Sequence, residues 1–107
     1  MEGAQAQDQM HHCASDEAGR ADVQLNSVYK SALATMSRDR VATAKLKAFE
    51  QAWIAYRDAY IDAMYPARDK QAYGTITPME IDLLAAELTR DQIKTLKSIQ
   101  QFYKDNQ

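Results

Sequence analysis

Residues 46–58 read LKAFEQAWIAYRD and decide the fold, because their large side chains recur at the spacing of one helix face. Together with the residues that follow, the stripe comprises Leu46, Phe49, Trp53, Tyr56, Tyr60 and Ala63. Alternating steps of three and four place these side chains along one side of a helix. Because burial of each large side chain contributes roughly 2 to 3 kcal/mol, the stripe is predicted to be the centre of the core.

Polar residues and a proline bound this helix. Residues 37–40, SRDR, predict a short connection before it, in which Ser37 or Asp39 caps the helix. Pro66 disfavours helical geometry at the residue before it, so the helix is predicted to end near Met64 or Tyr65. The mostly polar segment 66–75 reads as a loop.

The preceding segment, from about Gln7 to Met36, predicts another long helix. Its small or apolar residues recur by three and four at Met10, Ala14, Ala18, Ala21, Leu25, Val28, Ala32 and Met36. Residues 1–6 and 104–107, the two ends of the chain, are expected to fray.

Two capping boxes follow the loop. Residues 77–80, TPME, and 89–92, TRDQ, each place a threonine three residues before a glutamate or glutamine. They predict short helices from about Pro78 to Glu87 and from about Arg90 to Tyr103, joined by a tight corner. The predicted fold is a single all-α domain over residues 1–107, a small bundle of about four helices, in which two long antiparallel helices precede two shorter capped ones. The predicted core comprises Leu25, Val28, Phe49, Trp53, Tyr56, Leu84, Ile93 and Leu96.

Composition excludes several classes of protein. The 107 residues are 46% hydrophobic and 26% charged with a formal charge of −2, which argues against a general nucleic-acid binder. No apolar run approaches the ~20 residues of a membrane span, and no secretory signal opens the chain. The single cysteine, Cys13, cannot form a bridge within the chain.

No motif predicts catalysis or a cofactor. The chain contains no GxSxG, no HExxH and no glycine-rich phosphate loop, so an enzyme is not expected. His11, His12 and Cys13 are ligands of the kind that bind zinc, copper or nickel. Because adjacent helix positions point about 100° apart, three consecutive residues cannot close a tetrahedral site on one ion. They are therefore weak metal candidates.

Four polar residues flank the apolar faces and are the candidate site residues: Asp22, Asn26, Arg57 and Asp58. A polar residue beside a core stripe commonly satisfies a buried partner, so Arg57 or Asn26 is expected to bridge the two long helices, with Asp22 as a third member. In the alternative interpretation, Arg57 is a surface anchor for a partner protein.

Charge is uneven along the chain. Residues 1–26 carry a net charge of −4, and residues 38–58 carry +2. Either the two long helices complement each other, or the first presents an acidic patch to a basic partner.

Four runs of sequence resemble elements of the bacterial family named for the lysozyme inhibitor LprI. They are residues 21–29 (ADVQLNSVY), 46–58, 74–79 (GTITPM) and 88–96 (LTRDQIKTL), in the family's order and spacing across residues 10–100. The resemblance implies a small all-helical domain exported to the bacterial envelope or beyond, and inhibition of lysozyme as in the founding member.

The chain departs from this family in its cysteines. Cys13 matches one usual position, but no thiol follows the Arg57-Asp58-Ala59 element or precedes Leu88. The resemblance thus implies a remnant of a lost bridge network at Cys13. The expected function is a non-catalytic periplasmic or secreted protein that binds another protein, with lysozyme as the named partner. The alternatives are a self-associating structural protein and a metal-binding protein that uses His11, His12 and Cys13.

Overall fold

The computed structural model describes residues 2–107, apart from the side chains of residues 2–5, 70 and 71. Its elements are α1 (Glu2–Thr35), α2 (Arg40–Met64), the short 3-10 helix η1 (Lys70–Tyr73) and α3 (Thr77–Asp105). Residues 2–107 contain no strand, which confirms the all-α prediction.

The predicted count of four helices is wrong, because the two C-terminal helices are one. Thr89, the expected cap of a fourth helix, lies in the middle of α3 and is 1% exposed. Its Oγ1 donates to the carbonyl oxygen of Ala85 at 2.7 Å, one turn back, so the hydroxyl is satisfied without a break in the helix. An unbroken helix also buries Thr89, Gln92 and Ile93 together.

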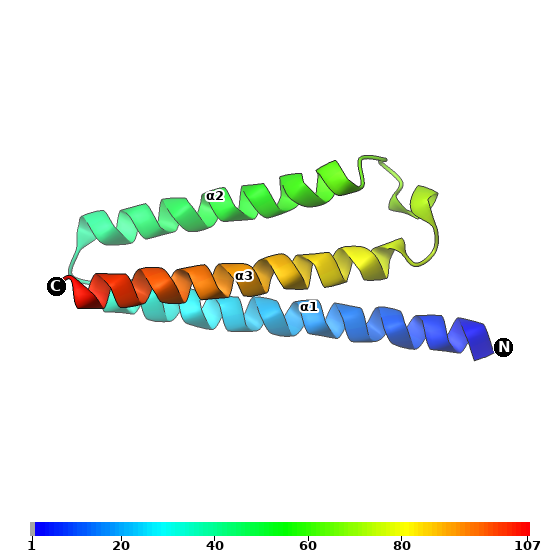
Figure 1. The fold of residues 1–107 in the computed structure, drawn as a ribbon, viewed down its shortest axis with the longest axis horizontal. Coiled ribbons are helices and arrows are strands. Elements are labelled where there is room, and N and C mark those ends of the chain that lie inside the picture. The colour runs from blue at the N-terminus through cyan, green and yellow to red at the C-terminus, as the bar shows by residue number, and fades with distance from the viewer. Residues whose placement is uncertain (1) are drawn as a thin grey trace.

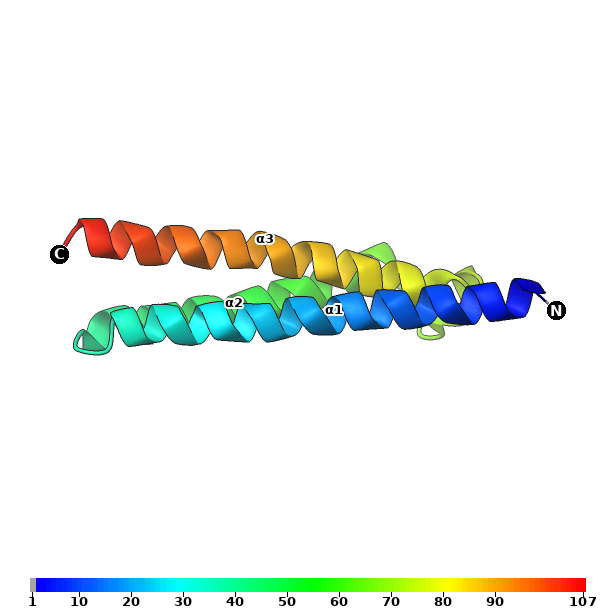
Figure 2. The ribbon, with the colours of Figure 1, turned by 90° about the horizontal axis from the view of Figure 1, so that it is seen from below.

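The three helices form an elongated bundle with extents of 59 × 26 × 15 Å (Figure 1). Helices α1 and α3 run in the same direction and pack closely along each other (Figures 1 and 2). Helix α2 runs antiparallel to both and connects the end of α1 to the start of α3 (Figure 1). The α1–α2 turn and the C-terminus lie at one end of the bundle, and the loop containing η1 lies at the other (Figure 1). The radius of gyration, 17.2 Å, exceeds the ~13 Å of a compact 100-residue domain.

The core lies where all three helices meet. Its buried residues are Leu25, Ala32, Met36, Leu46, Trp53, Ile93 and Leu96. Val28 and Leu84 are half-buried. Three aromatic residues of the predicted stripe are more exposed than expected, since Phe49, Tyr56 and Tyr60 are 37%, 54% and 38% exposed. The buried or half-buried residues Leu46, Glu50, Trp53 and Arg57 form the inward line of α2. Phe49 and Tyr56 follow Leu46 and Trp53 by three positions, so their side chains are turned about 60° away from those two residues.

The predicted ends of α2 are confirmed. Asp39 caps the helix by accepting a hydrogen bond from the backbone N–H of Ala42 at 2.9 Å, and the helix ends at Met64. The capping box at Thr77 does not form, because α3 already includes Thr77 and its cap residue, Ile76, makes no side-chain cap bond. Residues 2–6 lie within α1 and Lys104 and Asp105 within α3, while residue 1 lies outside the described residues.

Substitution of Thr89 distinguishes one helix from two. We expect Thr89→Val to change the free energy of unfolding by no more than about 1 kcal/mol, because it removes one hydrogen bond to the Ala85 carbonyl and the helix needs no cap there. Thr95→Val is the matched control, since the Thr95 hydroxyl bonds the Asp91 carbonyl at 3.1 Å on an exposed face. Urea denaturation measures both. A loss of about 2 kcal/mol in Thr89→Val alone would indicate a helix cap at Thr89.

Candidate functional site

Arg57 is the centre of a polar junction between α1 and α2. Its Nη1 lies 3.5 Å from Oδ1 of Asp22 on α1, and its Nε lies 3.7 Å from Oδ1 of Asp58. The guanidinium also lies over the Trp53 ring, 5.1 Å from the ring centroid. This cation–π contact fixes the guanidinium on the core while both carboxylates remain more than half exposed.

A hollow of about 210 Å³ opens at this junction. It is lined by Asp22, Leu25, Asn26, Trp53, Ile54 and Arg57. The structure therefore brings three of the four candidate residues to one hollow and places Asp58 beside it. The arrangement offers charge and hydrogen bonding on an aromatic floor, and its lining contains no serine, cysteine or histidine that could act as a nucleophile or base. It suits recognition of a polar surface.

Sequence reasoning missed Glu50, a buried carboxylate one turn before Trp53. Only 7% of Glu50 is exposed, and its Oε1 accepts a hydrogen bond from Nε2 of Gln92 on α3 at 3.2 Å. Its Oε2 is buried and has no hydrogen-bond partner among the described residues. Burial raises the pKa of the Glu50 carboxyl, and the Gln92 hydrogen bond and the positive charge of Arg57 counter this less strongly. Spacing could have revealed it, because Glu50 is four residues after Leu46 and three before Trp53.

The buried carboxylate also acts on α1. Burial and then the negative charge of Glu50 raise the pKa of Tyr29. Glu50 thus interacts with Tyr29 on α1, Gln92 on α3 and Arg57 on its own helix. Arg57 connects this buried group electrostatically to the exposed hollow.

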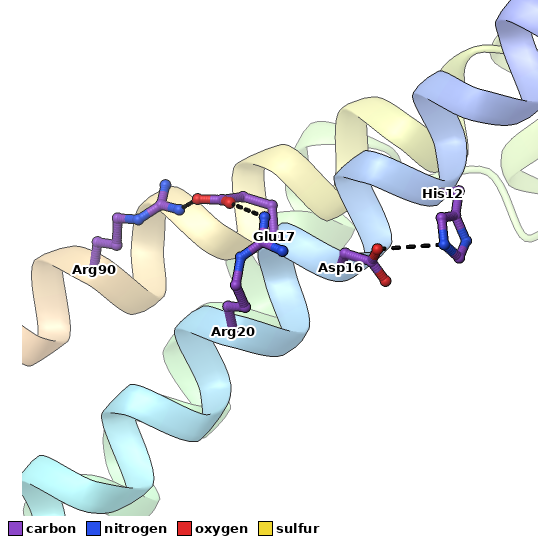
Figure 3. Close-up of polar contacts among 5 residues, drawn as sticks. All are labelled: His12, Asp16, Glu17, Arg20 and Arg90. Atoms are coloured by element: carbon purple, nitrogen blue, oxygen red, sulfur yellow. Dashed lines mark hydrogen bonds and ion pairs between the residues drawn. The ribbon is translucent and has the colours of Figure 1, made fainter.

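Ion pairs and hydrogen bonds join α1 to α3. The Glu17 carboxylate of α1 pairs with Arg90 of α3 and, at 2.7 Å, with Arg20 of its own helix (Figure 3). Nearer the α1–α2 turn, Nε2 of Gln100 donates to the hydroxyl oxygens of Ser31 at 3.0 Å and Thr35 at 2.8 Å. The acidic first helix is therefore complemented by α3 as well as by Arg57 of α2.

The histidine and cysteine cluster lies on α1 away from the hollow. His11 is half-buried with an unpartnered Nε2, whereas His12 is exposed and its Nε2 lies 3.3 Å from Oδ2 of Asp16 (Figure 3). Cys13 is an exposed free thiol. Across the described residues, no group of three or more His, Cys, Asp or Glu side chains is placed to hold a metal ion.

Replacing Arg57 tests the junction. We expect Arg57→Met to lower the free energy of unfolding by about 1 kcal/mol, because it removes a stacked cation and two partly exposed ion pairs. This corresponds to a fall in Tm of roughly 4 to 8 °C, measured by thermal denaturation. Arg40→Met is the control, since Arg40 is exposed at the start of α2. Equal Tm values for the two variants would contradict a structural role of Arg57.

Glu50→Gln tests the buried carboxylate. Because burial raises the pKa of Glu50, the wild type holds its full stability below the unfolded-state pKa and loses stability as pH rises through the folded-state pKa. We expect Glu50→Gln to be more stable than the wild type at neutral pH, because the amide has no charge to desolvate, with the difference vanishing in acid. Urea denaturation across pH measures this. The exposed Glu87→Gln is the control, and a neutral-pH loss in Glu50→Gln would overturn the assignment.

Comparison with known proteins identifies the family. The family model described as "Lysozyme inhibitor LprI" matches residues 1–96. The chain is also similar to an uncharacterized protein of Rhizobium meliloti (strain 1021), to which it is 32% identical over 108 residues, covering 90% of this chain and 75% of that protein. No solved structure matches the chain at a significant level. The match over residues 1–96 shows that this chain belongs to the LprI family.

Proposed function

We propose that this protein is a non-catalytic protein of the bacterial periplasm or exterior that binds another protein, and that its partner is a lysozyme, which it inhibits. Membership of the LprI family, described as lysozyme inhibitors, supports the proposal. Within residues 2–107, no helix is long and apolar enough to cross a membrane.

The charge of one half of the bundle supports a basic partner. This acidic half, residues 2–29 and 50–93, holds thirteen acidic and five basic residues, a formal charge of −8. Lysozymes are commonly basic proteins. Complementary fields of this kind raise the association rate and help to select the partner.

The Arg57 junction is the observation that carries the proposal. Asp22 and Asp58 have side chains 55% and 64% exposed, and Asp16 on α1 is 51% exposed. The contacts of Arg57 with Asp22, Asp58 and Trp53 hold the Asp22 carboxylate at the hollow and the Asp58 carboxylate beside it. We infer that Asp22, Asn26 and Asp58 contact the partner and that Arg57 positions them.

A lysozyme assay with charge-neutralised variants tests this function. We expect the wild type to inhibit a basic lysozyme at micromolar concentration, and the triple variant Asp16→Asn/Asp22→Asn/Asp58→Asn to require roughly tenfold more protein because the attraction is weakened. Isothermal titration calorimetry measures binding separately from inhibition.

Asp105→Asn is the control, because Asp105 is the last residue of α3 and lies outside the acidic half. This variant should inhibit as well as the wild type. A thermal melt of the triple variant verifies that it is folded. Absence of both binding and inhibition in the wild type would refute a lysozyme as the partner. Full inhibition by the folded triple variant would refute the junction as the contact surface.

A further inference from the structure

The half of the bundle opposite the acidic half is strongly basic. This basic half, residues 30–49 and 94–107, holds eight basic and two acidic residues, a formal charge of +6. On α1, the turn and α2 the basic residues are Lys30, Arg38, Arg40, Lys45 and Lys47, and on α3 they are Lys94, Lys97 and Lys104. These residues lie in the same part of the molecule, because the end of α1, the start of α2 and the end of α3 lie at the same end of the bundle (Figures 1 and 2).

These eight side chains are available for interaction. All eight residues are exposed, and none forms an ion pair within the part of the chain that the structure describes. The bundle is 59 Å long, whereas charges in physiological salt are screened over about 8 Å. The basic half therefore presents its own positive field, although the whole chain has a formal charge of only −2.

An apolar groove opens within the basic half. It has a volume of about 380 Å³ and lies between the start of α2 and the end of α3. Leu46, Phe49, Ile99 and Phe102 contribute to its walls, and Lys45 contributes an ammonium group on an apolar stem. Two large apolar residues in this half are among the most exposed of the chain, Phe102 at 70% and Val41 at 68%.

We propose that the basic half docks end-on against a bilayer containing anionic phospholipids. Lysine and arginine would lie at the headgroup phosphates, each strengthening binding by about fivefold, while Phe102 and Val41 enter the boundary of the acyl chains. The Lys45 stem would follow the apolar groove with its ammonium at the headgroups. A nucleic-acid backbone would interact with the basic residues alone and leave the apolar groove unoccupied. The apolar groove beside the lysines therefore indicates a bilayer as the partner.

The consequence is a fixed orientation. The acidic half, including Arg57 and its hollow, would point away from the lipid and into the surrounding solution. This docking does not depend on the lysozyme proposal, because the two proposals use residues of opposite halves.

Vesicle co-sedimentation tests the electrostatic part. We expect the wild type to bind vesicles of equal parts phosphatidylglycerol and phosphatidylcholine at low salt, and neither pure phosphatidylcholine nor the mixed vesicles at high salt. Lys45→Gln should weaken binding by about fivefold and Arg40→Gln/Lys45→Gln by about 25-fold. Arg68→Gln removes an exposed charge in the acidic half and should bind as the wild type does.

A second pair of variants tests insertion. Phe102→Ser should weaken binding to the mixed vesicles while preserving its salt dependence, because it removes an apolar contact and no charge. Val23→Ser is the matched control, since Val23 is 71% exposed on α1 within the acidic half.

Orientation is tested with an environment-sensitive dye. The exposed Cys13 carries the dye in the acidic half, and Val41→Cys in a Cys13→Ser background carries it in the basic half. Vesicles should shift the emission of the dye at position 41 and leave that of the dye at position 13 unchanged.

Several outcomes would overturn the proposal. One is absence of binding to the mixed vesicles at low salt, and another is equal binding by the wild type and Arg40→Gln/Lys45→Gln. Tight binding to heparin that Phe102→Ser leaves unchanged, together with unchanged vesicle binding by that variant, would reassign the basic half to general polyanions. Growth of end-to-end oligomers without vesicles, abolished by Arg40→Gln/Lys45→Gln, would reassign it to the acidic half of a second copy.

Discussion

The parallel packing of α1 against α3 is the constraint on which the rest of the structure depends. Leu25 and Ala32 of α1 meet Ile93 and Leu96 of α3 in the core, and Glu17–Arg90 and the bonds of Gln100 hold the pair at two further levels. Because two helices in sequence with a short turn must run antiparallel, only the third helix can lie parallel to the first. Helix α2 therefore serves as the return path and packs on the pair along one line of side chains.

That single line explains why α2 carries both the exposed aromatic residues and the candidate site. Leu46 and Trp53 of this line are buried, and Glu50 and Arg57 belong to the same line. A buried acid and a half-buried cation therefore alternate with the apolar residues. Trp53 lies between the two charges in sequence and stacks under the guanidinium. Arg57 thus lies between the exposed carboxylates of Asp22 and Asp58, with which it pairs, and the buried Glu50, whose pKa its positive charge lowers.

Local signals in the sequence predicted the parts of the structure that local interactions determine. The Asp39 cap and the end of α2 before Pro66 depend on neighbouring residues, and both are confirmed. The contact of Arg57 with Asp22 was predictable because both residues flank apolar faces. Tertiary packing decided the rest: Thr89 carries a complete capping signal, yet burial against the other helices keeps α3 continuous. Likewise, the predicted aromatic stripe runs through Phe49 and Tyr56, which lie beside the inward line of α2. Glu50 on that line was therefore overlooked, and Phe49 was assigned to the core.

The attachment of α2 along one line has a consequence for how the protein opens. Helices α1 and α3 share an extended contact, whereas α2 approaches α3 less closely. Helix α2 also contains the buried Glu50, whose Oε2 has no hydrogen-bond partner in the part of the chain that the structure describes. Free energies of local opening follow the density of buried contacts, so α2 is the part of the bundle that detaches at the lowest cost. Its amide protons would then exchange with solvent through a partly unfolded form in which α1 and α3 remain paired. The pairing of α1 with α3 is therefore expected to outlast the attachment of α2 when the bundle opens.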